Sequence, residues 1–393
     1  MSHERIAPGD ALALTRAMVR VDSRNPTLVA GAPGEGDVAR LLHAVLGGWG
    51  FRTEIQEVAP GRLNVLARIG TPGDRVLMFN GHLDVVGVEG MSHEPFVPAV
   101  RDGLLWGRGS ADMKGGVAAM CAAAARAGDR LGGGEVLIAA VIDEEWESLG
   151  TRHLIASGVR ADAAIVTEPT RLSIMPAHRG FAWVKVTVHG RAAHGSRWDI
   201  GIDAVRHAGL LLAELDRMDA EVLPSRSHPL LGRPSLHASL IEGGSGMSTY
   251  PERCTLKLER RTIPGEGPED VMAEVREACA RVHSRRQSFS ADVELMVAMG
   301  ASDVAVEAPV VQALHAALVR EGRDPVIEGM SAWTDCALLN EAGVPAVCFG
   351  PGDISLAHAA EEYVPVAEIE AAARVLEDVA LRWCAGDVAP WRS

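Results

Sequence analysis

The stretches VLMFNGHLDVV, residues 76–86, and GRGSADMKGG, residues 107–116, decide the fold of this chain. The first four residues are apolar and β-prone, which predicts a short buried strand. His82 and Asp84 follow at the end of that strand, and residues two apart in extended backbone point to the same side. Asp112 follows a glycine-rich approach and precedes an apolar, helix-forming run. A histidine and acidic residues at the mouth of a parallel sheet indicate a metal site.

The same pattern recurs along the chain. Three further apolar runs, ending at about residues 142, 167 and 349, are each followed by such side chains: Asp143, Glu144 and Glu145; Glu168; and His358. Strands that alternate with helices form mostly parallel sheets, and ligands bind outside the carboxyl ends of their strands. One acidic residue after a strand is ordinary turn chemistry. Four strand ends that all carry carboxylate or imidazole are better explained by a metal site.

The periodicity changes between residue 178 and the last strand. This segment alternates strands with two helices, which is typical of a compact α+β unit with both helices on one face of an antiparallel sheet. The sequence therefore predicts an α/β protein with a discontinuous, mostly parallel-sheet domain at residues 1–177 and 298–393. An α+β domain, residues 178–297, is inserted into it.

The composition excludes several function classes. With 393 residues, 47% of them hydrophobic, the chain can bury a large core. Its formal charge of −14 and the lack of a basic block argue against a nucleic-acid partner. We expect no membrane partner, because no apolar run approaches the length of a membrane span and the charged N-terminus does not resemble a signal peptide. Six scattered cysteines without CxxC spacing are interpreted as core thiols of a cytoplasmic protein.

Seven segments resemble, in order and spacing, the dinuclear zinc amidohydrolase family that includes acetylornithine deacetylase, succinyl-diaminopimelate desuccinylase, aminoacylase and glutamate carboxypeptidase. They are GHLDVV, GRGSADMKGG, DEEWESLGT, VTEPT, GRAAHGS, ERRTIPGE and GPGDISLAHAAEEYV. The resemblance covers nearly the whole chain. It implies a phosphorylase/hydrolase-like catalytic domain and a ferredoxin-like dimerisation or lid domain, and hence a homodimer formed through the inserted domain.

The resemblance also implies two zinc ions per subunit and assigns their ligands. His82 and Glu168 resemble the ligands of one zinc. Glu145 and His358 resemble those of the other, and Asp112 resembles the carboxylate that bridges the two ions. Each ion then has one imidazole and carboxylate oxygens, a set that suits zinc and admits cobalt or manganese. In the family the peptide bond after the bridging aspartate is cis, and the same is expected here.

The remaining site residues follow from the same resemblance. Asp84 would orient the ring of His82. Glu144 is the expected general base, which takes a proton from the metal-bound water and returns it to the leaving amine. A solvated acidic turn is the alternative, and the apolar strand before it disfavours that interpretation. His194 would reach the active site of the partner subunit and polarise the scissile carbonyl, whereas a lone surface histidine would be preferred without its motif. Arg261 would bind the carboxylate of the substrate through a bidentate fork.

These roles predict a metal-dependent hydrolase that cleaves the amide bond of N-acyl amino acids, in the manner of acetylornithine deacetylase and succinyl-diaminopimelate desuccinylase. A dipeptidase or a glutamate-carboxypeptidase-like exopeptidase is the first alternative, so that the small-molecule substrate is an N-acyl amino acid or a dipeptide. A catalytically inactive metal-binding relative is the second, and the presence of Glu144 speaks against it. The chain has Ser248 where relatives often have asparagine, which leaves the acyl group and the amino acid open.

Overall fold

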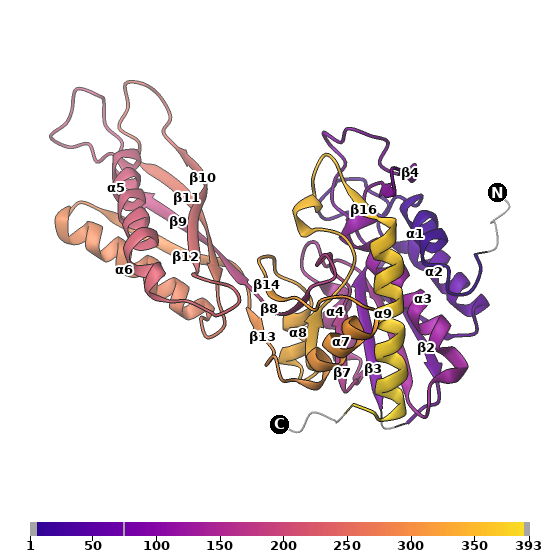
Figure 1. Ribbon diagram of the computed structural model, residues 1–393. Coiled ribbons are helices and arrows are strands. Elements are labelled where there is room, and N and C mark those ends of the chain that lie inside the picture. Colours follow the sequence, from indigo (N-terminus) through magenta and orange to yellow (C-terminus); the bar gives the residue numbers. More distant parts are fainter. Residues whose placement is uncertain (1–5, 74, 389–393) are drawn as a thin grey trace. The chain divides into compact units, whose positions relative to one another are not determined.

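The computed structural model describes residues 6–73 and 75–388, and the chain divides into two compact units (Figure 1). The first, called here the sheet unit, takes its described residues from 1–176, 304–328 and 334–393. The second, the insert unit, comprises residues 177–303 and 329–333. The function of the insert unit in dimerisation or as a lid stays a prediction.

A nine-stranded sheet has its centre in the sheet unit, while its residues 302–303 belong to the insert unit. Its strands, in spatial order, are β1 (Arg52–Ala59), β2 (Arg62–Gly70), β6 (Glu135–Val141), β3 (Val76–His82), β7 (Ala163–Val166), β15 (Ala346–Cys348), β8 (Ile174–His178) and β13 (Ser302–Asp303), with β14 (Ile327–Met330) paired to β8. The central strands β6, β3, β7 and β15 are parallel, and the outer pairs with known register are antiparallel. This mixed sheet with a parallel centre confirms the predicted α/β fold class.

The central strands are buried almost throughout, as their continuous apolar runs require. Their parallel register pairs His82 with Val141 and Asn80 with Val166, so that β3, β6 and β7 end at one edge of the sheet. The residues that follow these strands therefore meet at that edge. This convergence is what positions the candidate site.

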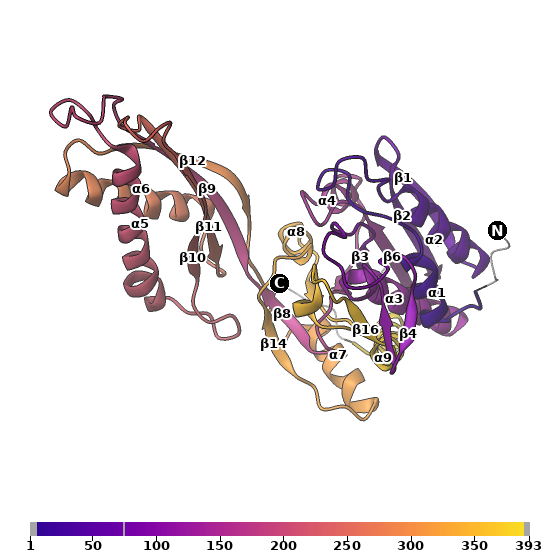
Figure 2. The ribbon, with the colours of Figure 1, turned by 90° about the horizontal axis from the view of Figure 1, so that it is seen from above.

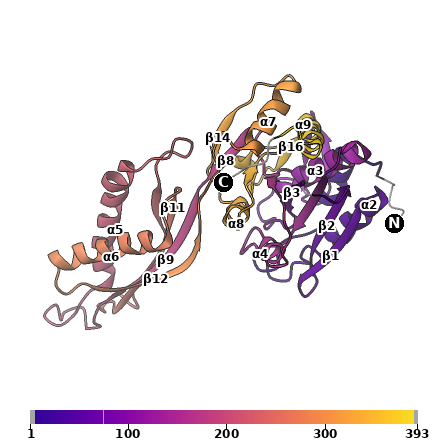
Figure 3. The same ribbon diagram turned by 90° about the horizontal axis from the view of Figure 1, so that it is seen from below.

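Helices cover both faces of this sheet (Figure 3). On one face, α3 (Gly115–Ala127) packs against α1 (Ala11–Val19) and α9 (Val366–Ala385). On the other face, α4 (Leu149–Ala156) packs against α8 (Cys336–Glu341). Two further helices complete the unit: α2 (Gly36–Gly48), which packs on β1 and β2, and α7 (Pro309–Arg320), which packs on α9. Across the described part of the chain, every helix is too short or too polar to cross a membrane.

A small three-stranded sheet also belongs to the sheet unit, and the sequence did not predict it. Strand β5 (Leu104–Trp106) pairs with β4 (Ala99–Arg101) on one side and with β16 (Tyr363–Pro365) on the other. Short helical turns occur as well: η1 (Ser110–Lys114), η2 (Gly128–Arg130) and η5 (Ile354–Leu356). Because β5 precedes η1 and β16 follows η5, this sheet brings the chain around Asp112 beside the chain around His358.

The insert unit has the chain order β9 (Gly180–His189), α5 (Ala204–Arg217), β10 (Ser235–Gly243), β11 (Arg253–Thr262), α6 (Pro268–Arg285) and β12 (Ser290–Met299), with turns η3 (Met218–Val222) and η4 (Leu223–Ser225) after α5. The strands form an antiparallel sheet in the order β10-β11-β9-β12, and both helices lie on one face of it (Figure 2). This βαββαβ order is ferredoxin-like. Helix α5 begins at Ala204, where the Asp203 carboxylate caps it by accepting from the backbone N–H of Arg206.

Candidate metal centre

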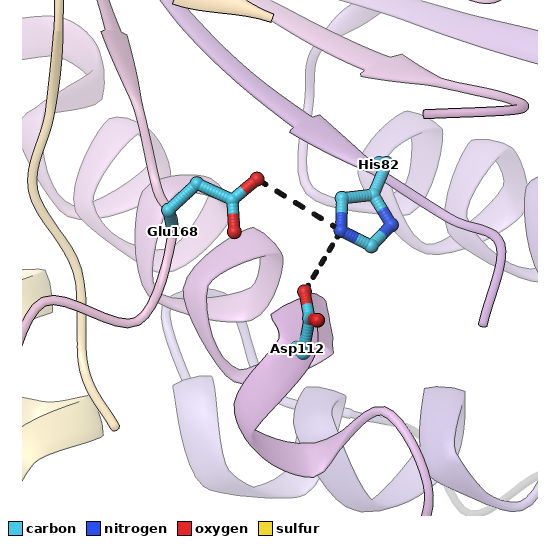
Figure 4. A group of neighbouring side chains, drawn as sticks. All are labelled: His82, Asp112 and Glu168. Carbon is cyan, nitrogen blue, oxygen red and sulfur yellow. Dashed lines mark hydrogen bonds and ion pairs between the residues drawn. The ribbon is translucent and has the colours of Figure 1, made fainter. Parts of the chain in front are cut away.

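The first candidate ligand group consists of His82 at the end of β3, Asp112 within η1 and Glu168 after β7 (Figure 4). His82 Nε2 is 3.0 Å from Asp112 Oδ1 and 3.9 Å from Glu168 Oε1. All three side chains are buried. His82 is the last residue of β3, and Glu168 comes two residues after β7, so the parallel register places both at the same sheet edge.

The second group shares Asp112 with the first. His358 Nε2 lies 2.9 Å from Glu145 Oε2 and 3.5 Å from Asp112 Oδ2. In each group one ligand atom per residue lies within 4.8 Å of the others. The two oxygens of Asp112 thus face two different imidazoles. The structure brings together the five residues predicted as ligands in this two-group arrangement, with the predicted cis peptide bond between Asp112 and Met113.

Several acidic side chains lie close together at the centre and shift one another's pKa values. Burial and the charge of Asp112 raise the pKa values of Glu145 and Glu168, and burial together with Glu168 and other nearby acids raises that of Glu144. The imidazole of His82 is buried, which opposes its charged form, yet the hydrogen bond and charge of Asp112 raise its pKa well above the usual value. Buried like charges are unfavourable unless a cation compensates them. Imidazole and carboxylate donors arranged around one shared carboxylate therefore fit two divalent cations.

Cation binding should release protons from this centre. The hydrogen bond and charge of Glu145, with the charge of Asp112, raise the pKa of His358 to about 9, so its imidazole is protonated in the metal-free chain near neutral pH. A ligating imidazole must be neutral. We expect the apparent affinity for zinc to rise as the pH increases from about 7 to about 9. Calorimetric titrations in two buffers of different ionisation enthalpy would measure the protons released. A pH-independent affinity with no proton release would contradict this expectation.

Asp84 holds the backbone that carries the expected general base. Its carboxylate oxygens accept hydrogen bonds from the backbone N–H groups of Glu144 and Glu145, both at 3.2 Å. The ring of His82 is oriented differently from the expectation: Nδ1 donates to the backbone carbonyl of Asp84 at 2.9 Å, while the nearer carboxylate oxygen lies 3.7 Å away. With Nδ1 held as a donor, Nε2 carries the lone pair in the neutral ring and would bind a cation in place of its hydrogen bond to Asp112.

Several buried polar residues near the centre were missed by the sequence analysis. Asn25 Nδ2 donates to Asp84 Oδ2 at 2.9 Å and to Asp143 Oδ1 at 3.0 Å. Arg62 lies 2.8 Å from Asp143 and also pairs with the buried Glu35. This network fixes Asp143, whose φ of 66° is in the left-handed region, directly before Glu144. No local pattern could have indicated it, because its members come from separate segments.

The other two predicted site residues belong to the insert unit. His194 is exposed, and its Nδ1 lies 2.8 Å from Ser196 Oγ. Arg261 pairs with Glu259, and its guanidinium lies 5.3 Å from the centre of the Phe181 ring. Arg260 points to the opposite, buried face and pairs with glutamates of α6 and the preceding turn, as strand alternation requires. The roles predicted for His194 and Arg261 stay predictions.

Comparison with known proteins decides the family. The model of "Peptidase family M20/M25/M40" matches residues 78–382, which include all five candidate ligands. The chain belongs to this family. As a member of family M20, it is a hydrolase of amide or peptide bonds.

Two named relatives resemble this chain over most of its length, and a solved structure shares its fold. The chain is 30% identical over 346 residues to acetylornithine deacetylase from Myxococcus xanthus, covering 86% of this chain and 89% of that protein. It is 28% identical over 367 residues to N-formyl-4-amino-5-aminomethyl-2-methylpyrimidine deformylase from Bacillus subtilis, covering 85% and 86%. A solved dinuclear metal-binding peptidase of family M20 from Bacillus subtilis has the same fold, with a TM-score of 0.73 at 15% identity over 94% of this chain and 96% of that one.

Proposed function

We propose that this M20 hydrolase cleaves the amide bond of N-acyl amino acids and holds two zinc ions at the candidate centre. The observation that carries the proposal is the shared carboxylate: Asp112 presents one oxygen to each ligand group, and Glu144 precedes a ligand of the second group in sequence. The relatives named acetylornithine deacetylase and deformylase, which by name remove small acyl groups, support a deacylase.

The ligands divide between the two ions as the two groups indicate. His82 and Glu168 would hold one ion, Glu145 and His358 the other, and Asp112 both. When bound, the ions lower the pKa of a water molecule towards neutrality and polarise the scissile carbonyl. Cobalt or manganese accepts the same donor types and could replace zinc.

Glu144 then acts as general acid and base. Its carboxylate takes the proton of the attacking water and later returns it to the nitrogen of the leaving amine. Burial raises the pKa of Glu144, which brings the carboxylate closer to the basicity that such proton transfer needs. Asp84 fixes its main chain through the N–H groups of residues 144 and 145. In the insert unit, Arg261 would bind the carboxylate of the substrate, and His194 would polarise the carbonyl from a partner subunit.

A hydrolysis panel tests the proposal. Acetyl, succinyl, formyl and aromatic N-acyl amino acids would be compared with dipeptides, using chain loaded with zinc, cobalt or manganese and chain stripped by a chelator. We expect turnover of at least one N-acyl amino acid, its loss on chelation and its recovery on adding metal. Cleavage confined to dipeptides would favour the exopeptidase alternative. No cleavage by the metal-loaded chain would favour the inactive relative.

We also expect the chain to form a homodimer through the insert unit. Strand β10 is an edge of the insert sheet, pairing only with β11 among the described strands, and Leu240 and Ile241 on it are 56% and 53% exposed. Unpaired edges of this kind template pairing with another chain.

Ile241→Lys should therefore yield monomers with at least about tenfold lower turnover. Light scattering coupled to gel filtration would measure the mass. Leu210→Lys, at an exposed position on α5 and away from both edges of the sheet, is the matched control. A monomeric wild type with full turnover would remove the cross-subunit role of His194.

A further inference from the structure

Glu362 is a buried carboxylate beside the centre with both oxygens fully occupied. Its Oε2 accepts from Arg108 Nη1 at 2.7 Å and from the backbone N–H of Gly109 at 3.0 Å. Its Oε1 accepts from the backbone N–H groups of Ala111 and Asp112, at 3.0 and 3.1 Å. Glu362 is 0% exposed and Arg108 3% exposed. One side chain thus holds the main chain of residues 109–112, which ends at the shared carboxylate.

The guanidinium of Arg108 extends this contact to two further segments. Its Nε donates to the carbonyl of Gly87 at 3.0 Å, and its Nη2 donates to the carbonyl of Ala359 at 3.4 Å. Gly87 lies three residues after Asp84, and Ala359 follows His358 directly. The pair therefore connects the segment that follows Asp84 with the segments that carry Asp112 and His358.

Stability alone explains this ion pair poorly. Removing two charges from water carries a large desolvation penalty, and apolar replacements of buried pairs are often as stable. Four donors on one carboxylate and three acceptors on one guanidinium instead define a single geometry. The two oxygens of Asp112 must face two imidazoles at once. A shift of its main chain would therefore misplace the carboxylate for both ligand groups.

We propose that Glu362 and Arg108 are positioning residues that hold Asp112 and His358 in the geometry that accepts two cations. This inference rests on the proposed two-metal hydrolase. Outer-shell partners of metal ligands typically change metal affinity or activity by about 10- to 100-fold when removed. Neither residue touches the ligand atoms, so both act through the backbone that they fix.

Glu362→Gln tests this role with little change in volume. The amide would face the donors of Arg108 and Gly109 with its own N–H groups, leaving them unpaired. We expect the affinity for the second zinc, and kcat, to fall about 10- to 100-fold, with KM changed by less than about threefold. Zinc stoichiometry and affinity would be measured by chelator competition. Glu135→Gln, which removes a buried glutamate paired with Arg52 and Arg68 at the far end of β6, is the matched control.

A double variant separates positioning from general stability. Arg108→Met with Glu362→Gln removes both charges, so it should recover the unfolding temperature lost by the single variant but not its zinc affinity. If zinc affinity recovered together with stability, the pair would be merely structural and the inference overturned. Wild-type zinc binding and turnover in Glu362→Gln would overturn it as well. Failure of the wild type itself to bind two ions would instead refute the proposed function.

Discussion

Glu144→Ala is expected to abolish hydrolysis and to leave the metal content of the chain unchanged. Glu144 lies outside both ligand groups, yet its neighbour Glu145 belongs to one of them, so the base can be deleted without removing a ligand. A positioned general base contributes about 10²- to 10⁴-fold to the rate, and we expect kcat to fall by at least that factor. Steady-state kinetics and the zinc content of the same preparation are the paired measurements.

Glu147→Ala is the control for this substitution, because Glu147 lies on the same turn and is exposed. It should leave both turnover and zinc content within about twofold of the wild type. If Glu144→Ala hydrolysed the best substrate at a near wild-type rate, the base would have to be another residue. If it lost zinc as well, Glu144 would be a ligand.

Asp112→Ala is expected to have the largest effect on metal content. Because this carboxylate serves both groups, its removal leaves each with only one imidazole and one carboxylate. Zinc requires three or four protein donors in most sites, so we expect fewer than one tightly bound ion per chain and no measurable turnover. Asp112→Asn keeps one oxygen and should retain at most one ion.

Elemental analysis after gel filtration would measure these stoichiometries, with circular dichroism as the test of folding. Asp37→Ala, which removes an exposed carboxylate on α2, is the control and should bind two ions. Two tightly bound ions in a folded Asp112→Ala variant would show that the shared carboxylate is not needed.

The parallel centre of the sheet and the candidate ligands were predictable for one physical reason. Strands that are buried on both faces have continuous apolar sequences, and the carboxyl ends of parallel strands lie at one edge of the sheet. His82, the residues after β6 and Glu168 therefore converge without any knowledge of the helices around them. His358 is further from its strand; the strand pattern included it among the candidates, and the family resemblance assigned it to one of the two ions.

The supporting residues were not predictable in the same way. Asn25, Arg108 and Glu362 act through hydrogen bonds to segments 21 to 254 residues away, and no local period indicates such contacts. Strands β4, β5 and β16 have three residues each, which is too short for a pattern to show. The ring of His82 donates to the backbone carbonyl of Asp84 rather than to its carboxylate. This choice depends on small differences in distance that a sequence pattern does not specify.

Anomalous diffraction from crystals grown with zinc would test the two-ion centre most directly. The predicted result is two peaks about 3.5–4 Å apart on either side of Asp112. One peak should lie beside His82 and Glu168, and the other beside Glu145 and His358. A single peak, or peaks that do not contact Asp112, would contradict the shared-carboxylate centre on which the proposed hydrolysis depends.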